Sequence, residues 1–247
     1  MRWRDVGVGL IATLVIWQIL AWLLDRPVFP PPTRVLPTFL DQIGGSLGGH
    51  LLVSTGRVLA AILVSMVVAV PAGLGLGQIR TLNRFFAPLI YVVYPIPKIV
   101  FLPVILILFG SGDGSKVLLV GLILFFQMLV VVRDQAAQLR PELIASVRSM
   151  GAGRRALFCF VYLPACVPAV ITALRVSIGT AIAVLFIAET YATSSGLGYY
   201  IVVESWGALR YPQMYAGVLA MSLLGLALYY AVDWLDRRLC PWREGMR

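Results

Sequence analysis

PELIASVRSMGAGRRALFCFVYLP, residues 141–164, is a polar, arginine-bearing segment between two strongly apolar stretches. Pro141 suits the first turn of a helix, because no amide donor is needed there. Three side chains then recur at helical spacing and predict one apolar face: Leu143, Val147 and Met150. Gly151 is expected to end this helix, since glycine readily takes the left-handed conformation at a helix end. A short amphipathic helix of this kind suits insertion into a groove on a partner.

The composition of the whole chain is that of a membrane protein. The 247 residues are 60% hydrophobic and 13% charged, whereas soluble domains carry about a quarter charged residues. Three uncharged runs have roughly the 20 residues that a helix needs to cross a bilayer: 6–24, 58–79 and 214–232. Three further runs are shorter or are interrupted by proline or charge: 85–109, 117–132 and 157–188. We therefore predict an all-α, polytopic protein with six transmembrane helices, residues 1–247 forming a single transmembrane domain.

The placement of lysine and arginine predicts the orientation. With six spans, 13 of the 20 basic residues lie on the side of both termini and five lie on the other side, while Lys98 and Arg175 fall within spans. Basic residues are enriched in cytoplasmic loops, so we expect both termini and the loop 133–164 to be cytoplasmic. The basic residues are spread over four segments, and the net charge of +9 therefore indicates no nucleic-acid surface.

The longest loop on the opposite side is predicted at 25–57. Within it, residues 35–43 are apolar enough to form a short helix on the membrane surface. Four glycines are expected to end that helix: Gly44, Gly45, Gly48 and Gly49. In the next span, three glycines predict a small-residue face for close helix packing: Gly73, Gly75 and Gly77.

The chain has little of the chemistry of an enzyme. His50 is the only histidine, and the three cysteines have no paired spacing that indicates a disulfide framework or a metal site. No Gly-x-x-x-x-Gly-Lys-Ser/Thr phosphate loop is present in the sequence. We predict no catalytic residue and no metal or cofactor bound by this chain, and ATP hydrolysis, if used, on another polypeptide.

Residues 141–164 resemble the loop of binding-protein-dependent ABC importer permeases, which reads Glu-Ala-Ala, three residues, Gly, nine residues, Ile-x-Leu-Pro. Four positions fit its end: Gly151, Val161, Leu163 and Pro164. The opening triad departs from the pattern, with Ala145, Ser146 and Val147 in its place, and Glu142 lies three residues earlier. Residues 95–98, 109–110 and 188–199 also look like the nitrate, sulfonate and taurine branch of these permeases.

The resemblance implies a type I ABC importer permease in the bacterial inner membrane. Its expected partners are two cytoplasmic ATPase subunits that bind ATP and Mg, a second permease copy in a homodimer, and an external solute-binding protein. Within the coupling loop 133–164, the resemblance implies that these residues meet the ATPase: Glu142, Ala145, Ser146, Met150, Gly151, Arg154, Arg155, Leu163 and Pro164.

Five residues are candidates for the substrate pathway: Pro97, Lys98, Glu189, Ser194 and Ser195. A cation inside a membrane costs roughly 2.5–3.5 kcal/mol, so Lys98 either borders a path for an anionic solute or reaches a backbone carbonyl or the interface. Glu189 either orients residues 190–198 or contacts solute, and the two serines belong to a gate or to an ordinary loop.

The predicted function is import of a small anionic solute, such as a sulfonate, taurine or nitrate, by alternating access. A secondary transporter driven by an ion gradient is one alternative, for which Glu189 is the only intramembrane acid candidate. A membrane scaffold that recruits a soluble partner through the same loop is the other alternative.

Overall fold

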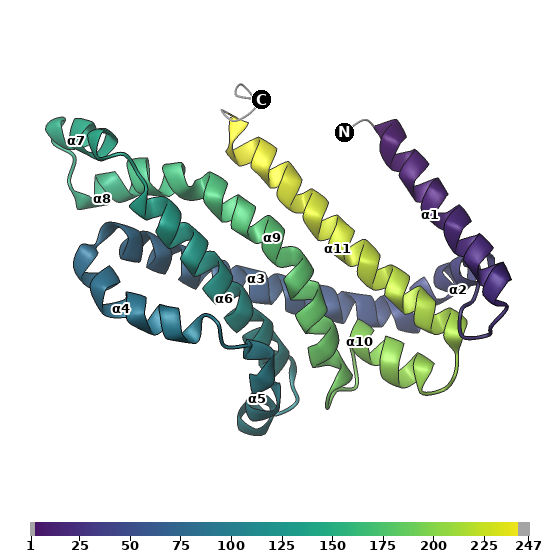
Figure 1. Cartoon of the computed structure of the whole chain (residues 1–247). Coiled ribbons are helices and arrows are strands. Elements are labelled where there is room, and N and C mark those ends of the chain that lie inside the picture. Colours follow the sequence, from purple (N-terminus) through teal and green to yellow (C-terminus); the bar gives the residue numbers. More distant parts are fainter. Residues whose placement is uncertain (1–2, 242–247) are drawn as a thin grey trace. The chain divides into compact units, whose positions relative to one another are not determined.

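The computed structural model describes residues 3–241, and every regular element among them is helical (Figure 1). Three arginines used to predict the orientation, Arg2, Arg243 and Arg247, lie outside the described residues. Five stretches are long and apolar enough to cross a membrane. They comprise α1 (Trp3–Leu24), α3 (Ser46–Gln78), α6 (Asp113–Ala137), α9 (Leu163–Thr190, extended at its start by the two short helices before it) and α11 (Tyr211–Leu239).

The sixth candidate span is broken. Helix α4 (Arg80–Val93) is followed by a 3₁₀ turn, η1 (Lys98–Phe101), and by α5 (Leu102–Phe109), with a bend of 80° between the two parts. The prolines of this stretch account for the break, because each removes a backbone donor and obstructs the preceding turn. The all-α, polytopic architecture is confirmed, with six spans when the bent pair is counted as one.

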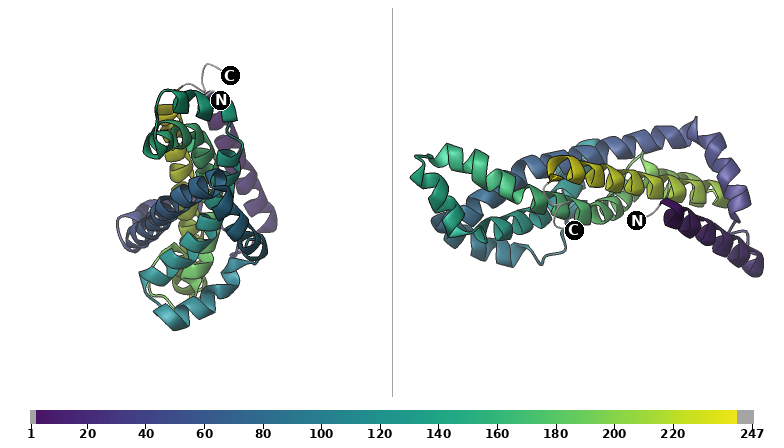
Figure 2. Two further views of the ribbon diagram at one scale, coloured as in Figure 1. Left: turned by 90° about the vertical axis from the view of Figure 1, so that its left-hand side faces the viewer. Right: turned by 90° about the horizontal axis from the view of Figure 1, so that it is seen from above.

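The remaining helices are short. They are α2 (Pro32–Ile43), α7 (Pro141–Ser149), α8 (Arg154–Leu157), the π-helix η2 (Phe158–Tyr162), α10 (Leu197–Tyr199) and the π-helix η3 (Tyr200–Trp206). Figures 1 and 2 show α7 and α8 beside each other, joined by a tight turn. The expected surface helix at 35–43 is present as α2, beginning three residues earlier at a proline.

The described residues group into two compact units. One contains the chain up to Thr55 together with Phe186–Leu224, and the other contains Gly56–Leu185 together with the chain from Gly225 onward. Helices α3, α9 and α11 each contribute residues to both units.

In the second unit, α3 packs closely on α6 through small residues. A Cβ on Gly73 would lie 2.9 Å from the Val132 Cβ, and a Cβ on Gly77 would lie 2.6 Å from the Ala136 Cβ. The predicted glycine face is therefore made by two of the three glycines, because a Cβ on Gly75 would meet nothing within 4 Å. In lipid the hydrophobic effect does not drive helices together, and close packing of their backbones stabilises the contact instead.

Ion pairs join the helices of the same unit. Arg175 of α9 donates to Asp233 and Asp236 of α11, at 3.1 Å each. Arg57 of α3 is 4% exposed and donates through Nε to Asp113 of α6 at 2.9 Å. These contacts explain how charged residues are held within apolar helices.

The predicted loop 25–57 is wrong beyond residue 45. Helix α3 begins at Ser46, so Gly48 and Gly49 lie inside it and only Gly44 and Gly45 form the turn after α2. Arg57, placed in that loop by its charge, lies within the helix because Asp113 neutralises it. Lys116 likewise lies within α6, where its amine donates to the Ser111 carbonyl.

A matched pair of glycine substitutions tests the α3–α6 contact. Gly77→Ala should lower the free energy of unfolding by about 1–3 kcal/mol, because the new methyl group meets the backbone of α6. Gly75→Ala should stabilise α3 by up to about 1 kcal/mol, since alanine is the better helix former and the site is open. Thermal unfolding of the purified protein in detergent measures both, and equal melting temperatures would contradict this packing.

Candidate functional site

Helix α7 has the two ends that the sequence predicts. It begins at Pro141, after Arg140 in extended conformation, and its last helical residue is Ser149. Gly151 follows with φ of +85°, the left-handed region that favours glycine, and its N–H donates to the Arg148 carbonyl at 2.9 Å. The helix is thus bounded by a proline at one end and a glycine turn at the other.

Most of the described side chains of α7 and its C-cap are exposed. They include three of the predicted coupling residues: Glu142, Ala145 and Ser146. Met150 is 76% exposed. It caps the helix rather than continuing it, so the apolar face predicted from three residues consists of Leu143 and Val147. These two line a pocket of about 400 Å³ together with the start of the next span, including Val161 and Pro164.

The chain after Gly151 leads directly into a membrane span. Arg154 begins α8, Arg155 is exposed, and η2 connects α8 to α9 without a gap. Leu163 and Pro164 are both exposed at the first turn of α9. The π-helix was not predicted, because single π turns leave no sequence pattern, although they recur at functional sites.

The ammonium group of Lys98 donates hydrogen bonds to backbone carbonyls of the residues just before it. Its side chain is buried, and Nζ donates to the carbonyls of Tyr94 at 2.9 Å, Val93 at 3.2 Å and Ile96 at 3.2 Å. The Phe126 ring centroid lies 4.6 Å from Nζ. An ammonium group has three donors, and all three are used here. These contacts match the carbonyl-pairing interpretation, and they close the bend of the broken span at Pro97, the N-cap of η1.

In the first unit, Glu189 organises the segment that follows it. Its side chain is fully buried and accepts from Ser54 Oγ at 2.8 Å and from the Gly198 N–H at 3.0 Å. Ser54 Oγ accepts in turn from the Leu197 N–H at 2.7 Å. The carboxylate therefore binds the chain at 197–198, a contact in keeping with the orienting role, which is one of the roles considered for it.

A second polar cluster lies beside it, centred on His50. The Gly196 N–H donates to His50 Nδ1 at 3.0 Å, so Nε2 carries the proton that is donated to Glu204 Oε2 at 3.1 Å. Glu204 also accepts from Ser46. Burial, followed by the Glu204 carboxylate, raises the pKa of the nearby Tyr200 hydroxyl. The sequence does not indicate this cluster, because its members are separated by about 150 residues and show no spacing pattern.

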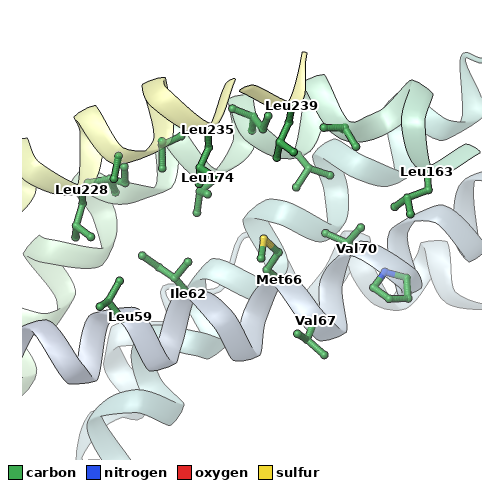
Figure 3. A pocket seen from close by; sticks show the side chains of 17 residues that line it. Leu59, Ile62, Met66, Val67, Val70, Leu163, Leu174, Leu228, Leu235 and Leu239 are labelled. Carbon is green, nitrogen blue, oxygen red and sulfur yellow. The ribbon is translucent and has the colours of Figure 1, made fainter. Parts of the chain in front are cut away.

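The two serine candidates lie in the segment between these clusters' residues, Glu189 and Gly196. Ser194 is exposed, and Ser195 is half-buried, with its carbonyl accepting from Thr193 Oγ1 at 3.2 Å. In the second unit, a cavity of about 690 Å³ opens among α3, α9 and α11 (Figure 3). Its 17 lining residues are all apolar, among them Met66, Leu174 and Leu235, so this cavity offers a polar solute no hydrogen bond.

Comparison with known proteins identifies the class. The model of the family described as binding-protein-dependent transport system inner membrane component matches residues 61–240. The chain belongs to this family of ABC importer permeases, which are membrane subunits for transport and not enzymes.

Several members are similar along nearly their whole length. The taurine transport system permease protein TauC of Escherichia coli is 30% identical, over 98% of this chain and 94% of the relative. The putative aliphatic sulfonates transport permease protein SsuC of Bacillus subtilis is 26% identical, over 94% and 84%. The formylaminopyrimidine transport permease protein ThiX of Halalkalibacterium halodurans is also 26% identical, over 94% and 92%. An inward-facing MetNI methionine ABC transporter has the same fold, with a TM-score of 0.62 at 20% identity over 78% of this chain and 96% of that one.

The contacts of Lys98 predict the effect of its removal. Lys98→Gln leaves two donors for three carbonyls, so the melting temperature should fall, at a cost of about 1–3 kcal/mol for the unpaired carbonyl. Solute preference in an uptake assay should stay unchanged, because the ammonium has no donor left for a solute. A shift of preference between anionic and neutral solutes at unchanged stability would contradict this role.

Glu189→Ala should destabilise more strongly. It leaves Ser54 Oγ and the Gly198 N–H buried without this acceptor, which costs about 1–3 kcal/mol for each group. Glu142→Ala, which removes an exposed carboxylate, is the matched control and should change the melting temperature little. Equal melting temperatures for the two variants would show that Glu189 does not hold the segment.

Proposed function

We propose that the protein is the membrane-spanning subunit of an ATP-driven importer, and that a separate ATPase subunit binds α7. The observation that carries the proposal is an exposed helix bounded by Pro141 and Gly151, directly connected to a membrane span. Two ATPase subunits, which hold ATP and Mg, a second permease copy and an external solute-binding protein complete the proposed assembly.

Charge pairing supports this assignment of α7. Three charged side chains that lie within spans and are not exposed, Arg57, Arg175 and Glu189, have partners. On and after α7, Glu142 and Arg155 form no ion pair with any residue whose side chain the structure describes. An exposed, unpaired set of charges beside an apolar pair, Leu143 and Val147, is suited to recognition by a protein groove.

The proposed mechanism is alternating access driven through α7. Closure of the ATPase subunits around ATP displaces α7, and Leu143 and Val147 transmit the displacement to the start of α9, whose residues line the same pocket. The start of α9, up to the interior Pro168, then shifts with α7.

The proposed solute is a small compound that carries an anionic sulfonate group, such as an aliphatic sulfonate or taurine. The names of two relatives, the taurine permease and the sulfonate permease, support it. The proposed location is the bacterial inner membrane with both termini in the cytoplasm. The predicted asymmetry of basic residues, 13 against five, supports this orientation, and it widens when Arg57 and Lys116 are placed within α3 and α6.

The alternatives explain less of the structure. An ion-gradient transporter needs an acidic group that can exchange an ion, and Glu189 is held by Ser54 and Gly198. A non-transport scaffold would use α7 as well, and reconstitution with the ATPase distinguishes it, because a scaffold neither stimulates ATP turnover nor moves solute.

Two valine substitutions test the proposed coupling. Gly151→Val places a β-branched residue at positive φ, at a cost of about 1–2 kcal/mol, and should lower uptake about tenfold while ATP turnover loses its dependence on solute. Gly153→Val is the control, because Gly153 has no positive φ and a Cβ there meets nothing within 4 Å. Both are measured in proteoliposomes with the ATPase subunit present, and full uptake by the Gly151 variant would refute the coupling role.

A further inference from the structure

A pocket of about 450 Å³ lies where α3 ends and α4 begins, beside the last turn of α7. One part of its wall is polar and basic, formed by Gln78, Arg80, Arg148 and Tyr162. Another part is apolar and includes Leu74 and Phe158. None of the described residues that line it is an aspartate or a glutamate. The pocket therefore combines two basic side chains with apolar ones and has no described acidic group to neutralise them.

The two arginines are available to a ligand. Arg80 and Arg148 are exposed, and neither forms an ion pair with any residue of the described chain. The Gln78 amide is already used, since it donates to the Ala136 carbonyl. Guanidinium groups bind phosphate oxygens through two parallel hydrogen bonds, which makes a pair of arginines a strong phosphate ligand.

The first turn of α4 also favours an anion in this pocket. Ile79 is the N-cap of this 14-residue helix and offers no side chain to cap the first N–H groups. Ile79 and Arg80 both line the pocket. Free N–H groups and the positive end of a helix dipole favour an anion at this position.

The apolar wall and the character of α4 indicate that the phosphate belongs to a lipid. After Arg80 and Arg84, α4 continues with apolar side chains that face outward: Phe85 is 76% exposed and Leu89 is 57% exposed. This order of basic then exposed apolar residues is typical of a helix at the boundary of head groups and acyl chains. Basic pockets between membrane helices bind anionic head groups, whereas a free phosphate ion gains nothing from Leu74 and Phe158.

We propose that this pocket binds the head group of an anionic phospholipid, with Arg80 and Arg148 on the phosphodiester and the apolar wall against the start of the acyl chains. The site shares α7 with the proposed ATPase contact through Arg148, but lipid binding at the pocket does not depend on the proposed function. Because Arg148 belongs to α7 and Arg80 to α4, a bound head group would link the coupling helix to the neighbouring broken span.

Native mass spectrometry of the purified full-length permease, titrated with phosphatidylglycerol, tests the proposal. Arg80→Gln and Arg148→Gln should each weaken binding roughly tenfold, and the double variant about a hundredfold, because each removes a charge-assisted contact. Arg140→Gln is the matched control: it removes the same charge from an exposed residue outside the pocket and should bind like the wild type. Melting temperatures without added lipid confirm that every variant is folded.

Two further arms distinguish the sources of the anion. Glycerol phosphate, which lacks acyl chains, should bind far more weakly than the lipid, and equal affinity would replace the lipid assignment with a soluble phosphate. Co-purification with the ATPase subunit should survive in Arg80→Gln, because Arg80 lies on α4 and not on α7. Loss of the subunit would overturn the proposal and assign the pocket to the protein interface. Unchanged lipid affinity in the variants would also overturn it and leave the arginines with neither role.

Discussion

Inside an apolar bilayer, every buried charge and every backbone polar group needs a partner, and this requirement arranges most of the chain. The backbone meets it with helices, which are the only regular elements among the described residues. The side chains meet it in pairs or clusters: Arg175 lies between two aspartates of α11, and Lys98 donates to three carbonyls at the bend of the broken span. These charged side chains within the spans thus stabilise the fold.

The same requirement distinguishes polar side chains that stabilise the fold from polar side chains that stay exposed and can bind a partner protein. Glu189 and His50 are both engaged with the segment 196–198, which makes them elements of a fixed turn. Helix α7 shows the opposite: its described charges are exposed, and its ends are fixed by Pro141 and Gly151. We expect a lever between a membrane domain and a soluble motor to be a helix with fixed ends and with surface charges that have no partner within the chain.

Local signals in the sequence were sufficient for the spans and for α7. Proline at the first turn and glycine at the end act on their own neighbours, so Pro141 and Gly151 predicted a helix that the structure contains. The start of α3 was misplaced by twelve residues, because Arg57 indicates a loop when its partner Asp113 is unknown. The Glu189 and His50 clusters join residues about 135–155 positions apart, and only the folded chain brings them together.

The central claim is that α7 is held by a separate ATPase subunit, and site-directed cross-linking tests it most directly. A variant without the exposed Cys159 and the buried Cys166 and Cys240 would carry one new cysteine at Ser146 on α7, or at the exposed Ser194 as a control. With the ATPase subunit present, the cysteine at position 146 should form a cross-link to it whose yield changes when ATP is added, while position 194 should form none. Equal yields at the two positions, or labelling of position 146 by a lipid-confined reagent alone, would contradict the account.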